Sequence, residues 1–74
     1  MTTRDELIEY GKKHGWKVAA ADSDAVLLHT ATARRQIFVQ FVDPDRIDYC
    51  QANTGRVYGG GRAVKRYLRE NGDA

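Results

Sequence analysis

The segment at residues 36–42 alternates between two kinds of side chain with a period of two, which is the repeat of a β-strand with one buried face. Ile37, Val39 and Phe41 fall on one side of this strand, whereas Phe38 falls on the other. A strand of this kind must bury its apolar side against a second layer of secondary structure. The chain has 74 residues, and a domain of that size buries only about 60% of the surface that its unfolded chain exposes. The sequence therefore predicts one thin core between two layers.

A helix is expected over residues 3–14. Thr3 and Glu6 have the spacing of a capping box, in which each side chain binds a backbone N–H group at the helix start. Gly15 follows the expected helix, and glycine is a common residue just after a helix because it readily adopts a left-handed backbone.

A second helix is expected near the other end of the chain. The glycines at residues 59–61 predict a flexible entry. From Arg62 onward, apolar and basic residues separate onto two sides at helical spacing. Residues 71–72 are expected to end this helix, and residues 73–74 are expected to fray.

Strands are expected between the two helices, separated by short runs of turn-forming residues. Trp16, Val18 and Ala20 are expected to share one face of the first strand, and a fourth strand is expected at residues 47–51. The expected turns lie at residues 22–24, 32–35 and 43–45. Helices at both ends of an antiparallel meander of three or four strands can cover the same sheet face. This arrangement is a two-layer α+β fold for a single domain at residues 1–74.

The helical stripes and the strand alternation converge on one face of the sheet, which predicts the core. Its expected members are Leu7, Ile8, Trp16, Val18, Leu28, Ile37, Val39, Phe41, Val64, Tyr67 and Leu68. A shift of one residue in strand register would reverse each of these assignments within its strand.

Composition excludes several classes of protein. With 42% hydrophobic and 30% charged residues, the chain resembles a folded protein rather than a disordered one. No apolar run approaches the roughly 18 to 20 residues of a membrane span, and the polar start at residues 1–6 is unlike a secretory signal. A single cysteine, Cys50, can form no disulfide within the chain, which indicates a reducing compartment. We therefore expect a cytoplasmic protein with no membrane partner.

The last third of the chain contains the strongest candidate site. Residues 53–74 include five basic and two acidic side chains, a net charge of +3, whereas the whole chain has a net charge of +2. Glycines at a helix start leave backbone N–H groups accessible to an anion, and cations one turn apart can follow neighbouring phosphates. The residues expected to bind an anion or nucleic acid are Arg56, Gly59, Gly60, Gly61, Arg62, Lys65, Arg66 and Arg69. The alternative interpretation is the solvated face that an amphipathic surface helix carries in any case.

The residues that catalyse reactions or bind metals are few and widely spaced. His14 is expected at a helix end, where a cation is favourable for structural reasons alone. His29 and Cys50 lie within expected strands, and neither has a partner at the spacing of a catalytic or metal-binding motif. We therefore expect no catalytic residues, no metal and no cofactor, with Cys50 packed as a small apolar side chain.

The face of the sheet away from the helices is a second candidate surface. If Val26 and Leu28 point into the core, then Leu27, His29 and Phe38 point away from it. Apolar residues gathered on such a face indicate a protein partner or a homo-oligomer.

Two resemblances bear on function. Residues 1–7, residues 13–16, the strand at residues 36–42 and the glycine-then-basic-helix ending resemble short uncharacterised proteins of actinobacteria-infecting phages. This resemblance implies an accessory protein that acts in the host cytoplasm by binding a host macromolecule, and it implies no particular chemistry.

The order of helix, three strands and helix is similar to that of double-stranded-RNA-binding domains and HicA-type toxins. Residues 7–8 followed by residues 15–16 resemble the HicA opening, but Ala-Asp-Ser-Asp-Ala at residues 21–25 replaces the glycine-serine-histidine motif of those ribonucleases. Residues 59–66 resemble the glycine-then-lysine entry to the second helix of the RNA-binding domains, although Val64 stands where one of their paired lysines would be. This resemblance implies binding of RNA by shape.

Three classes of function follow from the sequence. The first is a small non-enzymatic module that binds a host macromolecule, with nucleic-acid backbone held by the glycines and the basic helix. The second is a protein-interaction module or homo-oligomer that uses the far face of the sheet. The third is a HicA-like ribonuclease, against which the missing motif argues.

Overall fold

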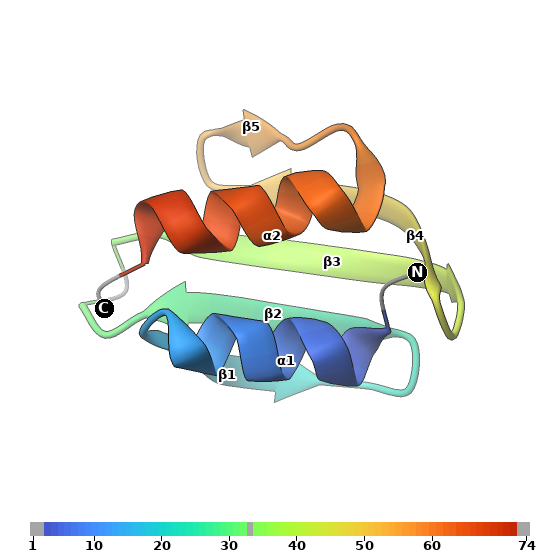
Figure 1. Cartoon of the computed structure of the whole chain (residues 1–74), viewed down its shortest axis with the longest axis horizontal. Coiled ribbons are helices and arrows are strands. Elements are labelled where there is room, and N and C mark those ends of the chain that lie inside the picture. Colours follow the sequence, from blue (N-terminus) through green and yellow to red (C-terminus); the bar gives the residue numbers. More distant parts are fainter. Residues whose placement is uncertain (1–2, 33, 73–74) are drawn as a thin grey trace.

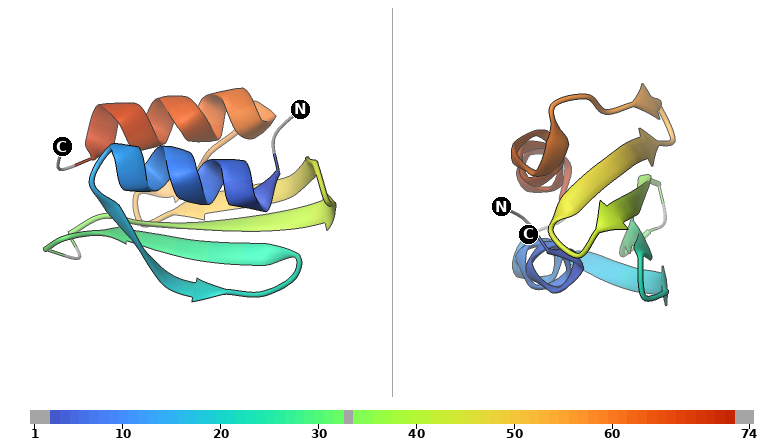
Figure 2. Two further views of the ribbon diagram at one scale, coloured as in Figure 1. Left: turned by 60° about the horizontal axis from the view of Figure 1, so that its bottom comes forward. Right: turned by 90° about the vertical axis from the view of Figure 1, so that its right-hand side faces the viewer.

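The computed structural model describes residues 3–32 and 34–72, so the expected fraying at 73–74 and Ala33 of the expected second turn lie outside the described residues. The elements in chain order are α1 (Arg4–Lys13), β1 (Trp16–Ala21), β2 (Ala25–Thr30), β3 (Gln36–Asp43), β4 (Arg46–Ala52), β5 (Gly55–Arg56) and α2 (Gly60–Asn71). The strands form one antiparallel sheet in the order β1-β2-β3-β4-β5, and both helices lie on the same face of it (Figures 1 and 2). The expected two-layer α+β meander is confirmed, with β5 added to the predicted three or four strands.

Helix α1 forms for the local reasons that its sequence predicts. The backbone N–H of Glu6 donates a hydrogen bond to Thr3 Oγ1 at 3.1 Å, which caps the first turn. After Lys13 the chain turns through Gly15, whose φ of +88° is left-handed. The expected helix at residues 3–14 is thus confirmed, with its first and last residues serving as caps.

Helix α2 begins two residues earlier than expected, at Gly60 instead of Arg62. Gly59 is its N-cap residue with φ of +112°, and Gly60 has φ of +69°. Residues with a side chain rarely adopt these backbone angles. The path of the chain from the sheet into the helical layer therefore requires glycine at both positions. The prediction of a flexible loop over residues 59–61 is therefore wrong for Gly60 and Gly61, which belong to the first helical turn.

The core lies between the sheet and the two helices. The buried cluster consists of Leu7, Trp16, Val26, Leu28, Ile37, Val39, Phe41, Cys50, Ala52, Val64 and Leu68, with Ile8 and Tyr67 packed partly buried against it. The expected core is confirmed apart from Val18, and Val26, Cys50 and Ala52 join it. Within the described residues, no helix has both the length and the apolarity that a membrane crossing requires.

Strand β1 departs from the alternation that its sequence predicts. Val18 pairs with Leu28, but Ala20 pairs with Leu27, because a β-bulge shifts the register between Val18 and Ala20. Ala20 is therefore on the sheet face away from the helices. Val18 remains on the helical side but is 37% exposed, because β1 is the edge strand and has a neighbouring strand on one side only. The prediction that Trp16, Val18 and Ala20 share one face is therefore correct for Trp16 and Val18 and wrong for Ala20, and the prediction that Val18 is in the core is wrong.

Candidate functional site

The outward side of α2 presents a continuous row of positive charge. Val64 and Leu68 are fully buried against the sheet, so the opposite side of the helix faces solvent. The side chains on that side, which we call the basic face, are Arg62, Lys65, Arg66 and Arg69. All three arginines are exposed and Lys65 is half-buried. The four cations that the sequence places on one helical stripe are thus brought together.

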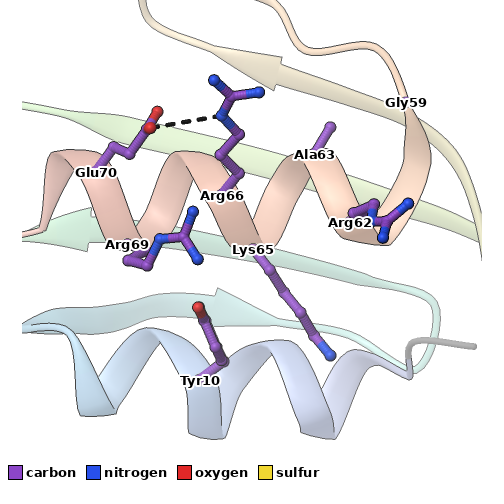
Figure 3. A pocket seen from close by; sticks show the side chains of 8 residues that line it. All are labelled: Tyr10, Gly59, Arg62, Ala63, Lys65, Arg66, Arg69 and Glu70. Atoms are coloured by element: carbon purple, nitrogen blue, oxygen red, sulfur yellow. Dashed lines mark hydrogen bonds and ion pairs between the residues drawn. The ribbon is translucent and has the colours of Figure 1, made fainter.

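A groove of about 640 Å³ runs along the basic face and is closed on one side by Tyr10 of α1 (Figure 3). Lys65 crosses it toward α1, where its Nζ lies 3.7 Å from Glu6 Oε2 and 5.8 Å from the centre of the Tyr10 ring. Figure 3 shows Arg66 turned the other way, with Nε 3.4 Å from Glu70 Oε2. Two of the four cations therefore already have acidic partners.

Arg62 and Arg69 differ from the other two cations. Within the part of the chain that the structure describes, no carboxylate lies within 4.0 Å of either guanidinium. Both side chains line the groove. They are two helical turns apart, about 10 Å along the axis at 1.5 Å per residue. Among the described residues, these two arginines are the cations of the basic face that have no acidic partner.

The surface of α1 beside Lys65 carries charges of both signs. A second hollow there is lined by the carboxylates of Asp5, Glu6 and Glu9 and also by Lys13 and Lys65. Its three carboxylates and two ammonium groups make this hollow less favourable to an anion than the groove along α2, where four cations face one carboxylate. The basic face is a strip along one helix and does not extend over both helices.

Arg56 does not join the basic face, contrary to its grouping in the sequence. It pairs with Gln51 across β4 and β5, and Gln51 alternates with the buried side chains of Cys50 and Ala52. The Arg56 guanidinium consequently lies on the far side of the sheet, 5.0 Å above the ring centre of Tyr49. Strand alternation separates Arg56 from the cations of α2.

The sheet face away from the helices, which we call the open face, consists of three rows of paired side chains. The rows are Lys17, His29 and Gln36; Ala20, Leu27, Phe38, Gln51 and Arg56; and Ala25, Gln40 and Tyr49. Leu27, His29 and Phe38 therefore lie where the sequence places them. None of the residues in these rows is acidic.

Tyr49 is a member of the open face that sequence reasoning does not find. In a regular strand, Ile47 and Tyr49 would share a face. The pairs Phe41–Ile47 and Gln40–Tyr49 show a bulge at this point in β4, which places the two residues on opposite faces. The Tyr49 ring lies 6.0 Å from that of Phe38 and is 36% exposed. Only the pairing of β4 with β3 reveals this aromatic pair.

The histidines and the cysteine have structural surroundings. His14 caps α1 and packs against Tyr10 with the rings tilted and their centres 4.7 Å apart. His29 Nδ1 lies 2.7 Å from the backbone oxygen of Thr30. Cys50 is in the core, as expected, and burial raises the pKa of its thiol from 9.0 to about 12. Among residues 3–32 and 34–72, no group of three or more His, Cys, Asp and Glu side chains could hold a metal ion.

Comparison with other proteins does not assign these surfaces to a family. No family model matches the chain, and no curated protein or solved structure matches it significantly. The function is therefore inferred from the residues and contacts described above.

Proposed function

We propose that this protein is a non-enzymatic module that binds the phosphate backbone of nucleic acid along the basic face of α2. The observation that carries this proposal is the pair Arg62 and Arg69, which are exposed, line one groove and have no acidic partner within 4.0 Å among the described residues. A guanidinium binds phosphate oxygens through two parallel hydrogen bonds. Two such groups about 10 Å apart can contact separate phosphates of one strand.

The chemistry of the groove favours backbone contacts over base recognition. Arginines on the outside of a helix reach phosphate oxygens without entering a nucleic-acid groove, and such contacts carry no sequence information. We therefore expect little sequence preference and a strong dependence of affinity on salt. The carboxylates of Asp5, Glu6 and Glu9 favour a ligand that lies closer to α2 than to α1.

The proposal includes the biological setting that the phage resemblance implies. The ligand would be a host nucleic acid, and the protein would act in the host cytoplasm. The single thiol, Cys50, supports a reducing compartment because it is buried and has no second cysteine with which to pair.

The test is a titration of labelled single strands, duplex DNA and duplex RNA, monitored by fluorescence anisotropy at several salt concentrations. We expect the logarithm of the affinity to fall linearly with the logarithm of the salt concentration, with a slope of roughly 0.7 to 0.9 per contacted phosphate. The double variant Arg62→Glu/Arg69→Glu should bind at least about tenfold more weakly, since loss of a charged hydrogen bond costs on the order of 1.5 to 3 kcal/mol. Arg66 is left unchanged because it already pairs with Glu70.

A matched control separates the basic face from net charge. Arg34→Glu/Arg35→Glu makes the same change in total charge at two exposed residues that do not line the groove. Equal losses in the two double variants would show that net charge alone attracts the ligand. Absence of binding tighter than roughly 10⁻⁴ M, the weak end of non-specific association, would refute the proposal. Cleavage of the RNA that His29→Ala abolishes would favour the ribonuclease instead.

A further inference from the structure

The open face of the sheet carries an aromatic pair with a cation stacked on it. The rings of Phe38 and Tyr49 lie 6.0 Å apart on neighbouring strands. The Arg56 guanidinium lies 5.0 Å from the centre of the Tyr49 ring, within the range of a cation–π interaction. These three groups come from β3, β4 and β5, so the sheet holds them side by side.

The aromatic surface continues around the edge of the sheet toward α2. A hollow of about 130 Å³ at this edge is lined by residues that include Tyr49, Arg56, Tyr58 and Gly59. The Tyr58 side chain is 79% exposed. Because Gly59 also lines the groove of the basic face, the two surfaces adjoin at the start of α2.

The charge of the open face suits a polyanion. Its three rows contain Lys17 and Arg56 and no acidic residue. Two carboxylates border these rows: Asp22 lines a hollow with Ala20, Leu27 and Phe38, and Asp48 lines the hollow at the edge. Arg56 lines the edge hollow and Arg62 lines the adjoining groove, so we expect a phosphate beside either arginine, with an uncharged base between them.

We propose that the open face binds the unpaired bases of a single-stranded nucleic acid, which stack on Phe38 and Tyr49 while the backbone passes Arg56 and turns toward Arg62. Aromatic side chains on an exposed sheet bind single strands in this way, because every base has a stacking face. The inference rests on the proposed function, to which it adds the ligand class. A duplex cannot bind in the same way, because its bases are already stacked on one another.

A second copy of the chain is the competing occupant of the open face, and the composition of the face argues against it. Interface cores between identical subunits are apolar and poor in charged residues. The open face instead interleaves its aromatic rings with polar side chains. Those side chains are Lys17, His29, Gln36, Gln40, Gln51 and Arg56.

The experiment uses oligonucleotides of equal length, single-stranded and duplex, that contain the fluorescent base 2-aminopurine. We expect the protein to quench the single strand, because stacking on an aromatic ring lowers the emission of this base, and to leave the duplex unchanged. Tyr49→Leu keeps an apolar side chain but removes the ring. It should weaken single-strand binding roughly 5- to 150-fold, the equivalent of about 1 to 3 kcal/mol per stacked base, and should change duplex binding less than twofold.

Two further variants complete the experiment. Val18→Ala truncates an exposed apolar residue on the helical side of β1, so we expect it to bind like the parent protein. If Tyr49→Leu fails to fold, Arg56→Gln serves in its place, since this exposed residue contributes no core contact. We expect Arg56→Gln to weaken single-strand binding with the quenching at saturation retained.

The outcomes distinguish this inference from the proposed function. If Arg62→Glu/Arg69→Glu weakens binding but Tyr49→Leu and Arg56→Gln do not, the ligand binds the basic face and the inference about the open face is wrong. If Tyr49→Leu weakens single-strand binding but Arg62→Glu/Arg69→Glu does not, the ligand binds the open face and the proposed role of the basic face is wrong. The remaining outcome is that sedimentation detects a dimer of the parent protein that is absent in Phe38→Leu. That result would show that a second copy covers the open face, and it would overturn the inference.

Discussion

The indole N–H of Trp16 donates a hydrogen bond to the backbone oxygen of Leu68 over a distance of 2.8 Å. The two residues are 52 positions apart in the sequence, and their bond joins the first residue of β1 to the last turn of α2. Carbonyl groups in the last turn of a helix have no partner within the helix. The indole supplies that partner inside the core, where Trp16 is 2% exposed. This contact therefore joins β1 to α2 within the core.

Replacing Trp16 with phenylalanine tests that contact. The variant keeps an aromatic ring but leaves the buried oxygen of Leu68 without its donor, which costs on the order of 1 to 3 kcal/mol. We expect a lower urea midpoint with an unchanged slope. Tyr58→Phe is the control, because it removes a polar group from an exposed aromatic residue and should leave the midpoint unchanged. A Trp16→Phe midpoint equal to that of the parent would show that water replaces the indole at no cost.

Gly72 is expected to tolerate no side chain. A Cβ atom at this position would lie 2.0 Å from the backbone oxygen of His14 and 2.9 Å from that of Leu68. Its backbone φ of −77° is an ordinary value, so the cost of Gly72→Ala arises from space alone. We expect a loss of roughly 1 to 3 kcal/mol, typical of overpacking, as a fall in thermal midpoint. Glu70→Ala in the same helical turn should stay within about 0.5 kcal/mol of the parent; equal midpoints for the two variants would contradict the prediction.

The two phenylalanines of β3 provide a paired test of which sheet face is buried. Phe41 is 4% exposed and lies in the core, whereas Phe38 is half-buried on the open face. Phe41→Ala should cost on the order of 3 to 5 kcal/mol, which a domain of this size hardly survives. Phe38→Ala should cost clearly less, and chemical denaturation of both variants measures the difference. A more damaging Phe38→Ala would mean that the strand register is reversed.

The raised pKa of the Cys50 thiol should lower the free energy of unfolding at high pH. Because its pKa rises from 9.0 to about 12 on folding, the folded protein keeps the proton that the unfolded chain loses. The stabilisation is complete below pH 9 and disappears as pH rises toward 12. The stability of the parent should therefore fall more steeply between pH 8.5 and 11 than that of Cys50→Ala, as measured by urea midpoints. Both proteins contain the same tyrosines and lysines, so a difference between their curves of stability against pH comes from the thiol. Parallel curves would show that folding does not raise the pKa of Cys50.

Local sequence chemistry determined the elements themselves. The capping pair of Thr3 and Glu6, the left-handed Gly15 and the alternation at residues 36–42 each act within a few positions of the chain. These signals depend mainly on neighbours along the chain, which is why the two helices, the central strands and most of the core agree with prediction. The outward position of Arg62 and Arg69 follows from the same helical periodicity.

The face that each strand residue occupies depends on tertiary structure, as do the contacts between distant groups. Bulges in β1 and β4 move Ala20 and Tyr49 to the open face, and a bulge depends on pairing with another strand, which no short segment of sequence encodes. Arg56 reaches Tyr49 instead of the basic face because β5 pairs with β4. The bond between Trp16 and the last turn of α2 likewise exists only once both helices lie on the sheet. Periodicity is a property of neighbours along the chain, whereas register and contact are properties of segments that meet on folding.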